Sequence, residues 1–189
     1  MKVGLFFGSF NPTHIGHLII ADSLLSAAKL DEVWFVVSPQ NPFKEKEGLA
    51  DIEKRIKWAQ KCVEPHAELK VCSIETQLPL PSYTEQTLEA LQKENPNHQF
   101  HLLMGSDSYS SLPKWKNAMD WMHKYPIEVY QREGSETTHL LTKRTHLHRL
   151  PLLPISATDM RIKIYHKESI RFWILEEIRK EVELEYANS

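Results

Sequence analysis

Two histidines stand three positions apart just after the first apolar run of this 189-residue chain. The run KVGLFF, residues 2–7, is typical of a buried strand, and GSFNPTHIGH, residues 8–17, leads from it into a predicted helix. Glycine lets a backbone approach a ligand closely, and the N–H groups and dipole at a helix start attract an anion. His14 and His17 lie on one side of that helix start and can donate hydrogen bonds to phosphate oxygens. The segment therefore predicts a phosphate-binding site.

Two other interpretations of the histidine pair compete with phosphate binding. Either histidine could cap the helix or pack in the core. The pair could also bind zinc, but zinc needs further ligands, and no His/Cys cluster of suitable spacing follows. Neither Gly-x-Gly-x-x-Gly nor Gly-Lys-Ser/Thr occurs, so the predicted site is neither a dinucleotide-binding fingerprint nor a P-loop.

A second segment with phosphate-binding chemistry is ISATDMR, which begins at Ile155. Ser156 and Asp159 have the spacing of a capping box, which predicts a helix start. The N–H groups of that start could face an anion, together with Thr158 and Arg161. Taken alone, the segment could equally be an ordinary capping box with a solvated arginine.

Apolar runs typical of strands alternate with helical periodicity along the chain. The predicted strands are residues 2–7, 32–38, 70–74, 99–105, 127–131 and a short one near 148–154. The predicted helices are residues 15–28, 51–62 (N-cap Asp51), 81–94 (capping box Ser82 and Glu85), 113–124 and about 169–184. This alternation predicts an α/β fold, Rossmann-like and doubly wound, with a mostly parallel sheet and helices on both faces.

Residues with binding chemistry follow several of the predicted strands. Residues 8–17, 38–44, 105–107 and Arg132 each come directly after one. In open parallel sheets, ligands bind outside the carboxyl ends of the strands. We therefore expect these segments to converge on one crevice.

Composition narrows the class of protein. The chain has 23 Lys and Arg against 25 Asp and Glu, which gives no basic excess and argues against a nucleic-acid partner. No apolar stretch approaches a membrane span, and no secretory leader is evident, so we expect a cytoplasmic protein without a membrane partner. Cys62 and Cys72 are expected to be free thiols. The length fits a single domain over residues 1–189, with a helical C-terminal part from about 155 to 189.

The two motifs resemble the (H/T)-x-G-H and S-x-T-x-x-R signatures of the nucleotidyltransferase superfamily. Three further segments, PSYTEQTL at 81–88, MGSDSYSSLPKW at 104–115 and QREG at 131–134, resemble the bacterial nicotinate mononucleotide adenylyltransferases. The resemblance spans essentially the whole chain. It implies that ATP and nicotinate mononucleotide react to give deamido-NAD and pyrophosphate, by direct in-line attack, and that Mg²⁺ enters with ATP. It implies no dedicated metal site in the protein.

One position departs from that family, whose first motif usually reads Gly-Gly-Thr-Phe-Asp-Pro. Here the segment is Phe7-Gly8-Ser9-Phe10-Asn11-Pro12. Asn11 lacks the negative charge of the aspartate, which puts a direct metal-ligand role of that position in doubt.

The resemblance also implies roles for individual residues. The implied catalytic residues are His14, His17, Arg161 and Lys44, with His17 acting on the charge that develops at the α-phosphorus. The implied ATP-binding residues are Gly8, Ser9, Phe10, His14, Gly16, His17, Gly105, Asp107, Ile155, Ser156, Thr158 and Arg161. The implied mononucleotide-binding residues are Lys44, Ser82, Tyr83, Thr84, Asp107, Trp115 and Arg132. Arg55 lies where the family often has a basic residue, or it is an exposed residue of a surface helix.

Three rival functions share part of this pattern. A phosphopantetheine adenylyltransferase would have both phosphate motifs but not PSYTEQTL or LPKW. A fragment of a class I aminoacyl-tRNA synthetase would carry HIGH, but no Lys-Met-Ser-Lys-Ser follows. A nucleotide-binding regulator would keep the fold and release no pyrophosphate. The sequence leaves open whether the protein is a homo-oligomer.

Overall fold

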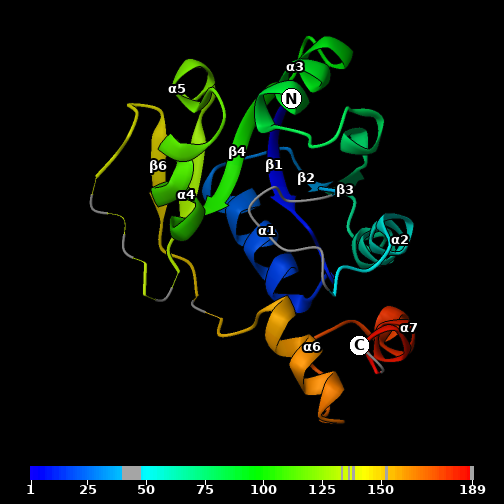
Figure 1. The fold of residues 1–189 in the computed structure, drawn as a ribbon. Coiled ribbons are helices and arrows are strands. Elements are labelled where there is room, and N and C mark those ends of the chain that lie inside the picture. Colours follow the sequence, from blue (N-terminus) through cyan, green and yellow to red (C-terminus); the bar gives the residue numbers. More distant parts are fainter. Residues whose placement is uncertain (40–47, 133, 136, 138, 152, 188–189) are drawn as a thin grey trace.

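A six-stranded, all-parallel sheet forms the centre of the molecule in the computed structural model, which describes residues 1–39, 48–132, 134–135, 137, 139–151 and 153–187 (Figure 1). The strand order is β3-β2-β1-β4-β5-β6. The strands are β1 (Lys2–Gly8), β2 (Glu32–Val37), β3 (Leu69–Cys72), β4 (Gln99–Gly105), β5 (Ile127–Tyr130) and β6 (Thr145–His148). The order reverses between β1 and β4, so the topological switch point of the sheet lies between these two strands.

Helices cover both faces of the sheet. Those described are α1 (Ile15–Ala27), α2 (Ile52–Val63), α3 (Thr84–Glu94), α4 (Ser106–Ser111), α5 (Ala118–Trp121), α6 (Ala157–Tyr165), α7 (Glu176–Tyr186) and the 3₁₀ turns η1 (Ile74–Gln77) and η2 (Leu112–Lys114). One buried cluster joins α1, α2, α6 and α7 to the sheet, and a second joins α3, α4 and α5 to its other face. The predicted doubly wound α/β fold is therefore confirmed.

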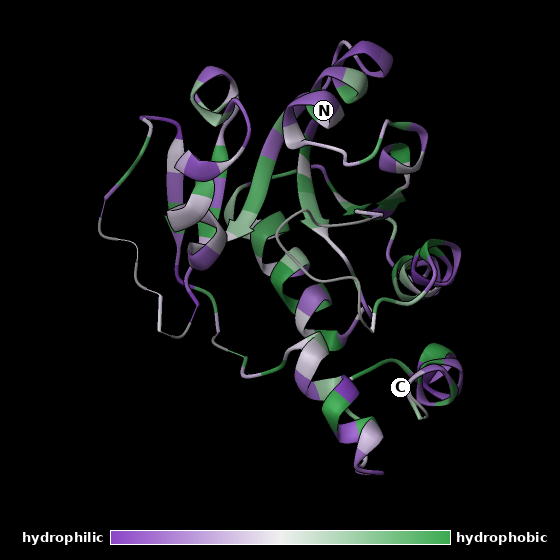
Figure 2. Ribbon diagram, viewed as in Figure 1, coloured by the Kyte–Doolittle hydropathy of each residue, from purple (hydrophilic) through white to green (hydrophobic). Residues whose placement is uncertain are grey.

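Side chains alternate across the sheet and fill both cores. On β1, Phe6 belongs to the first cluster and Leu5 to the second, while on β4 Leu103 and Leu102 divide in the same way. This is the period of two that a strand imposes on its side chains. Hydrophobic residues accordingly gather on the strands, and hydrophilic ones on the outer turns of the helices (Figure 2).

Several predicted elements match the structure closely. The strand over 99–105 has the predicted bounds, and α1 buries Leu18, Ala21 and Leu24 on the predicted face. Asp51 is the N-cap of α2, and its carboxylate accepts the Glu53 N–H at 2.9 Å. These features depend on residues close together in the chain, so local pattern was enough to find them.

The predicted continuous helix over residues 113–124 is wrong. The structure has the η2 turn and the short helix α5, separated by Asn117 in the left-handed region at φ 52°. Trp115 has an extended backbone with ψ 150°, so it follows a turn and does not begin a helix. The Asn117 side-chain amide donates to the carboxylate of Glu85 on α3 at 2.7 Å. This contact with another element fixes the residue that interrupts the helix.

The predicted capping box of Ser82 and Glu85 is also wrong. Tyr83 is the N-cap of α3, and the Ser82 hydroxyl donates to the Glu75 carboxylate at 3.0 Å. Glu75 is buried and also accepts the hydroxyl of Thr87 at 2.8 Å. A buried carboxylate needs such donors, and this need draws Ser82 away from the helix end.

Two further boundaries differ from the prediction. The last strand is β6 at Thr145–His148 rather than near 148–154, because it pairs with β5 and places His148 against Glu128 at 2.6 Å. The last helix begins at Glu176 rather than near residue 169. The residues predicted to be buried there, such as Ile170 and Ile174, do lie in the core, although they precede the helix.

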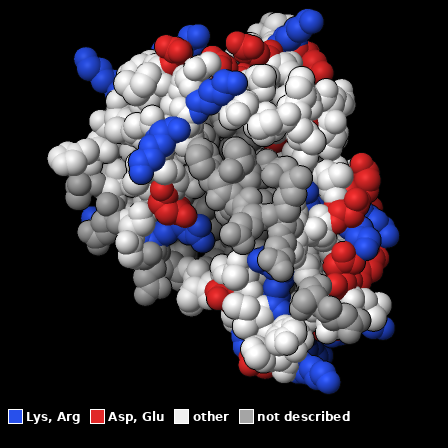
Figure 3. Space-filling model, viewed as in Figure 1, with Lys and Arg blue, Asp and Glu red and all other residues white. Residues whose placement is uncertain are grey.

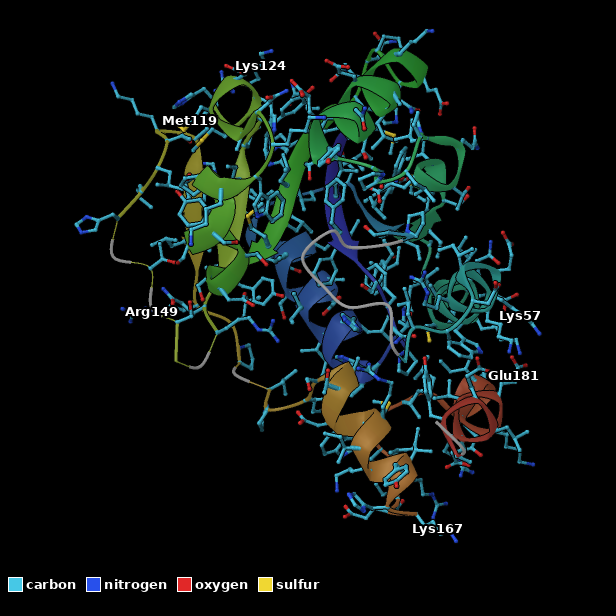
Figure 4. All side chains as sticks on the ribbon, viewed as in Figure 1. Lys57, Met119, Lys124, Arg149, Lys167 and Glu181 are labelled. Atoms are coloured by element: carbon cyan, nitrogen blue, oxygen red, sulfur yellow. The ribbon has the colours of Figure 1, made fainter. Side chains whose placement is uncertain are left out.

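Helices α2 and α7 face each other through opposite charges. Lys57 and Lys61 on α2 lie 3.5 and 2.6 Å from the Glu181 carboxylate on α7 (Figure 4). On the face drawn in Figure 3, described Lys and Arg side chains are interspersed with Asp and Glu. Among the described residues, no helix is long and apolar enough to span a membrane.

Candidate active site

A cleft of about 830 Å³ opens at the switch point of the sheet, where β1 and β4 end. Such a volume suits a ligand of nucleotide size. Fourteen predicted site residues line the cleft: Gly8, Ser9, Phe10, His14, Gly16, His17, Gly105, Asp107, Trp115, Arg132, Ile155, Ser156, Thr158 and Arg161. The predicted convergence at the carboxyl ends of the strands is therefore observed for these residues.

The histidine pair is held in one arrangement. The rings of His14 and His17 stack with centroids 3.7 Å apart, and the His14 N–H donates to His17 Nδ1 at 3.2 Å. Phe10, whose ring is buried, packs edge-on against the His17 ring at 5.0 Å. Because Nδ1 accepts this hydrogen bond, the neutral His17 ring carries its proton on Nε2.

Gly16 makes room for His14. A Cβ atom at position 16 would lie 3.0 Å from both Cε1 and Nδ1 of the His14 ring. That separation is shorter than an ordinary van der Waals contact, so any larger residue would displace the ring. The same Cβ would lie 3.8 Å from Cβ of Ile155, which shows how near the two motifs come. The glycine inside H-x-G-H is thus explained by packing.

His14 is buried, and its pKa is lowered to about 4, chiefly by burial and to a smaller extent by the positive charge of Arg132. The ring is therefore neutral at pH 7 and has one N–H to donate. Its Nδ1 atom is buried and has no hydrogen-bond partner among the described residues. The interpretation of His14 as an ordinary satisfied core residue does not fit this unpaired atom.

The second motif begins helix α6 as predicted. Ser156 is the N-cap, accepting the Asp159 N–H at 3.1 Å and donating to the Asp159 carboxylate at 2.6 Å. Arg161 lies one turn into the helix, where its Nη1 donates to the Asn11 carbonyl at 2.8 Å and its Nη2 to the Thr158 hydroxyl at 3.3 Å. The two motifs, 150 residues apart in the chain, are thus joined at the cleft.

Asn11 has a buried, fully engaged side chain. Its Oδ1 accepts the Ala50 N–H at 3.0 Å and a short hydrogen bond from the Tyr186 hydroxyl, and its Nδ2 donates to the Gly48 carbonyl at 2.8 Å. An aspartate could not make the last of these bonds. The side chain braces the backbone around the first motif, so its departure from the family pattern has a structural counterpart.

A charged pair stands in the cleft where β4 and β5 end. Arg132 Nη1 lies 3.1 Å from the Asp107 carboxylate, and both side chains are about half exposed. A Cβ at Gly105 would approach Asp107 Oδ1 to 2.4 Å and Arg132 Cδ to 2.7 Å. Any larger residue at this position would displace the Asp107 and Arg132 side chains from the arrangement described. A ligand in the cleft could therefore donate a hydrogen bond to the Asp107 carboxylate and accept one from the Arg132 guanidinium.

The residues predicted to bind the mononucleotide are only partly assembled at the cleft. Trp115 lines it, whereas Ser82, Tyr83 and Thr84 are not among the lining residues. They are nevertheless close to the tryptophan segment, because Lys116 Nζ lies 4.1 Å from the centre of the Tyr83 ring. Lys44 lies outside the described residues.

Arg55 is a buried residue of α2 and supports the loops around the cleft from behind. It is 1% exposed, so the alternative of an exposed residue on a surface helix is wrong. Its guanidinium donates to backbone carbonyls at the ends of both β1 and β2. Helical spacing carried the signal: Arg55 shares the apolar face of Ile52 and Ala59, at separations of three and four residues.

Comparison with known proteins agrees with this arrangement. A family model described as Cytidylyltransferase-like matches residues 5–163. A Cytophaga hutchinsonii protein named "Probable nicotinate-nucleotide adenylyltransferase" is 40% identical over 181 residues, 95% of this chain and 94% of that protein. A Flavobacterium psychrophilum protein of the same name is 41% identical over 174 residues, 90% of each.

A solved structure shares the fold. The Plasmodium falciparum nicotinic acid mononucleotide adenylyltransferase, determined in complex with NaAD, superposes with a TM-score of 0.80 over 95% of both chains. Its sequence is 16% identical, so this likeness concerns the fold.

Proposed function

This chain belongs to the cytidylyltransferase-like family, and from that premise we propose that it transfers the adenylyl group of ATP to nicotinate mononucleotide. The observation that carries the proposal is the Arg161–Asn11 hydrogen bond, which joins the two phosphate-binding motifs at one cleft. The names of the relatives from Cytophaga and Flavobacterium support the choice of substrate.

The proposed reaction is an in-line displacement at phosphorus. A phosphate oxygen of the mononucleotide attacks the α-phosphorus of ATP, and the bond from that phosphorus to the bridging oxygen of the β-phosphate breaks. Pyrophosphate leaves with the electron pair, and deamido-NAD is the second product. The protein need supply no nucleophile, so its task is to position two anions and stabilise the charge of the transition state.

His17 fits the role of the donor to the α-phosphate. Its ring is fixed between His14 and Phe10, and its proton is on Nε2, as the hydrogen bond to Nδ1 requires. A donor held in place before the reaction needs no reorganisation when charge develops. Neutral His14, beside it, supplies a second N–H without the repulsion that two stacked cations would suffer.

The β- and γ-phosphates would lie at the start of α6. Ala157, Thr158 and Asp159 of the first turn line the cleft, and Arg161 adds a guanidinium there. Arg161 already uses Nη1 on the Asn11 carbonyl, so its orientation is set before ATP binds. The leaving pyrophosphate would thus gain both the helix dipole and a full positive charge.

The mononucleotide would occupy the other side of the cleft. Trp115 is half-buried there and offers a flat apolar surface for a pyridine ring, its Nε1 donating to the Ser111 hydroxyl at 3.3 Å. The Asp107–Arg132 pair could exchange partners with a ribose hydroxyl and a phosphate.

Mg²⁺ is proposed to enter bound to ATP. It would neutralise phosphate charge, and phosphate oxygens and water would supply most of its ligands, as is common for this ion. Among the described residues no group of three or more His, Cys, Asp or Glu could hold a metal, while Asp107 offers one carboxylate on the cleft wall. These residues fit an ion carried in by its substrate.

The test is the product formed from defined substrates. The purified chain is incubated with Mg²⁺–ATP and, separately, nicotinate mononucleotide, the amidated mononucleotide, 4′-phosphopantetheine or no acceptor, and pyrophosphate and dinucleotide are measured. Pyrophosphate release with deamido-NAD as the main product supports the proposal. Preference for phosphopantetheine, or ATP binding without turnover, would contradict it.

A histidine variant links the activity to this cleft. His17→Ala should lower kcat by about 10²-fold or more, as for loss of a well-placed electrostatic donor, and change ATP affinity less. His66→Ala is the matched control, because His66 is exposed in the turn between α2 and β3. Near-normal turnover in His17→Ala would exclude the proposed role of this side chain.

A further inference from the structure

Arg55 is a buried cation whose hydrogen bonds, in the described part of the chain, all go to backbone carbonyls. Its Nη1 donates to the carbonyls of Ser9 at 2.7 Å and Ser38 at 2.8 Å. Its Nη2 donates to Pro39 at 2.9 Å and its Nε to Ala50 at 2.9 Å. No salt bridge to a described carboxylate accompanies these bonds, although Asp51 attracts the guanidinium through space and burying a charge is costly. Four backbone carbonyls in three segments thus share one guanidinium.

The bond to Ser9 fixes a peptide group inside the first motif. In a trans peptide the C=O and the N–H point in opposite directions. Because the Ser9 carbonyl points toward Arg55, the Phe10 N–H of the same peptide unit points away from it. Phe10 has φ 45°, the left-handed region that a bulky residue rarely adopts, so surrounding contacts must hold this turn.

The Phe10 N–H donates no hydrogen bond to another described residue. Residues 8–10 line the cleft, and the Ser38 N–H donates to the Gly8 carbonyl at 2.9 Å, which ties the same turn to the end of β2. A backbone N–H that lacks a protein partner beside a cleft is a ready donor to an anion. If the Ser9–Phe10 peptide flipped, the Ser9 carbonyl oxygen, instead of the Phe10 N–H, would face an anion bound in the cleft.

We propose that Arg55 is a positioning residue for adenylyl transfer, which locks the Ser9–Phe10 peptide with its N–H available to an ATP phosphate. Arg55 acts through the backbone and does not touch the substrate. Its positive charge, which Asp51 attracts through space but which forms no salt bridge with a described carboxylate, also favours an anion on the far side of the same peptide. This role depends on the proposed function, because it concerns the phosphates of the nucleotide substrate.

Three variants separate geometry from charge. Arg55→Lys keeps the charge but cannot reach four carbonyls with one fork, and Arg55→Met removes the charge as well. Lys57→Met is the matched control, because it removes a positive charge from the same helix at an exposed site (Figure 4). Each variant is assayed at 15 °C, with circular dichroism and thermal unfolding to measure the folded fraction.

The probe for the phosphate site is inorganic pyrophosphate with Mg²⁺, measured by calorimetry, together with kcat and both KM values. We expect Arg55→Lys to weaken pyrophosphate binding about tenfold and lower kcat by about 10- to 100-fold per folded molecule, as for a small misplacement of catalytic groups. The KM for the mononucleotide should change less than twofold, since Trp115 is untouched. The losses should be greater in Arg55→Met and absent in Lys57→Met.

A purely structural role predicts a different result. If Arg55→Lys binds pyrophosphate and turns over like the original chain once corrected for folded fraction, the proposal is wrong. If the variants fail to fold, the unaltered protein decides: the Phe10 amide resonance should shift downfield on adding pyrophosphate, and an unmoved resonance would refute the proposal. Because pyrophosphate binding needs no turnover, this arm is informative even if no deamido-NAD forms.

Discussion

Replacing Gly16 by alanine should separate activity from stability. The new Cβ would lie 3.0 Å from Cε1 and Nδ1 of His14, whereas carbon contacts prefer about 3.5–4.0 Å. The His14 ring must therefore move by about half an ångström. Because His17 stacks on it at 3.7 Å, the displacement reaches the second histidine as well.

The two consequences of this change differ in sign. Glycine within a helix is less stable than alanine by roughly 0.5–1 kcal/mol, so the substitution stabilises α1. The displaced His14 side chain leaves its preferred rotamer, which destabilises the protein by a similar amount. The two effects therefore nearly cancel. We expect the thermal midpoint to change little. A displacement of about 1 Å costs on the order of 10²-fold in rate, so half of that should lower kcat/KM by about tenfold or more.

The assay is pyrophosphate release at saturating mononucleotide, combined with thermal unfolding of the same samples. Ser26→Ala is the control, because Ser26 is exposed near the end of α1 and its replacement raises helix propensity away from the cleft. Gly16→Ala with full turnover would refute the packing argument. A loss of activity that parallels a large loss of stability would show that Gly16 serves the fold rather than the histidine pair.

The remaining predictions concern three other side chains. Arg161→Ala removes a charge-assisted donor worth about 1.5–3 kcal/mol, so ATP binding should weaken by about 10- to 100-fold with mononucleotide binding unchanged, and separate titrations giving the reverse would contradict the assignment. Trp115→Ala should raise the KM for nicotinate mononucleotide and spare ATP binding; unfolding in circular dichroism would show instead that the ring is a core residue. His14 has a pKa lowered to about 4 from 6.5, so the unfolded chain takes up its proton first and stability is lost as pH falls from 6.5 toward 4. The free energy of unfolding, measured with denaturant between pH 7 and 5, should fall less in His14→Gln than in the unaltered chain. An equal fall in the two proteins would refute this account of His14.

The sequence alone determined the features that depend on near neighbours in the chain. The alternation of strands and helices, the N-caps Asp51 and Ser156, and the strand over residues 99–105 follow from periodicity and short-range hydrogen bonds. The convergence of the motifs also followed, because parallel strands end at one edge of a sheet. The position of the cleft could therefore be predicted from the local sequence pattern together with one topological rule.

Only the tertiary structure decided how polar groups from distant segments share partners. Ser82 leaves the end of α3 for buried Glu75, Asn117 interrupts a helix to reach Glu85, and Arg55 turns inward to four carbonyls. In each case the local preference was plausible, but a partner in another segment created a stronger demand: the buried Glu75 carboxylate for Ser82, the Glu85 carboxylate for Asn117, and backbone carbonyls for Arg55. Buried polar groups must find hydrogen-bond partners wherever the fold provides them, and that requirement cannot be read from spacing along the chain.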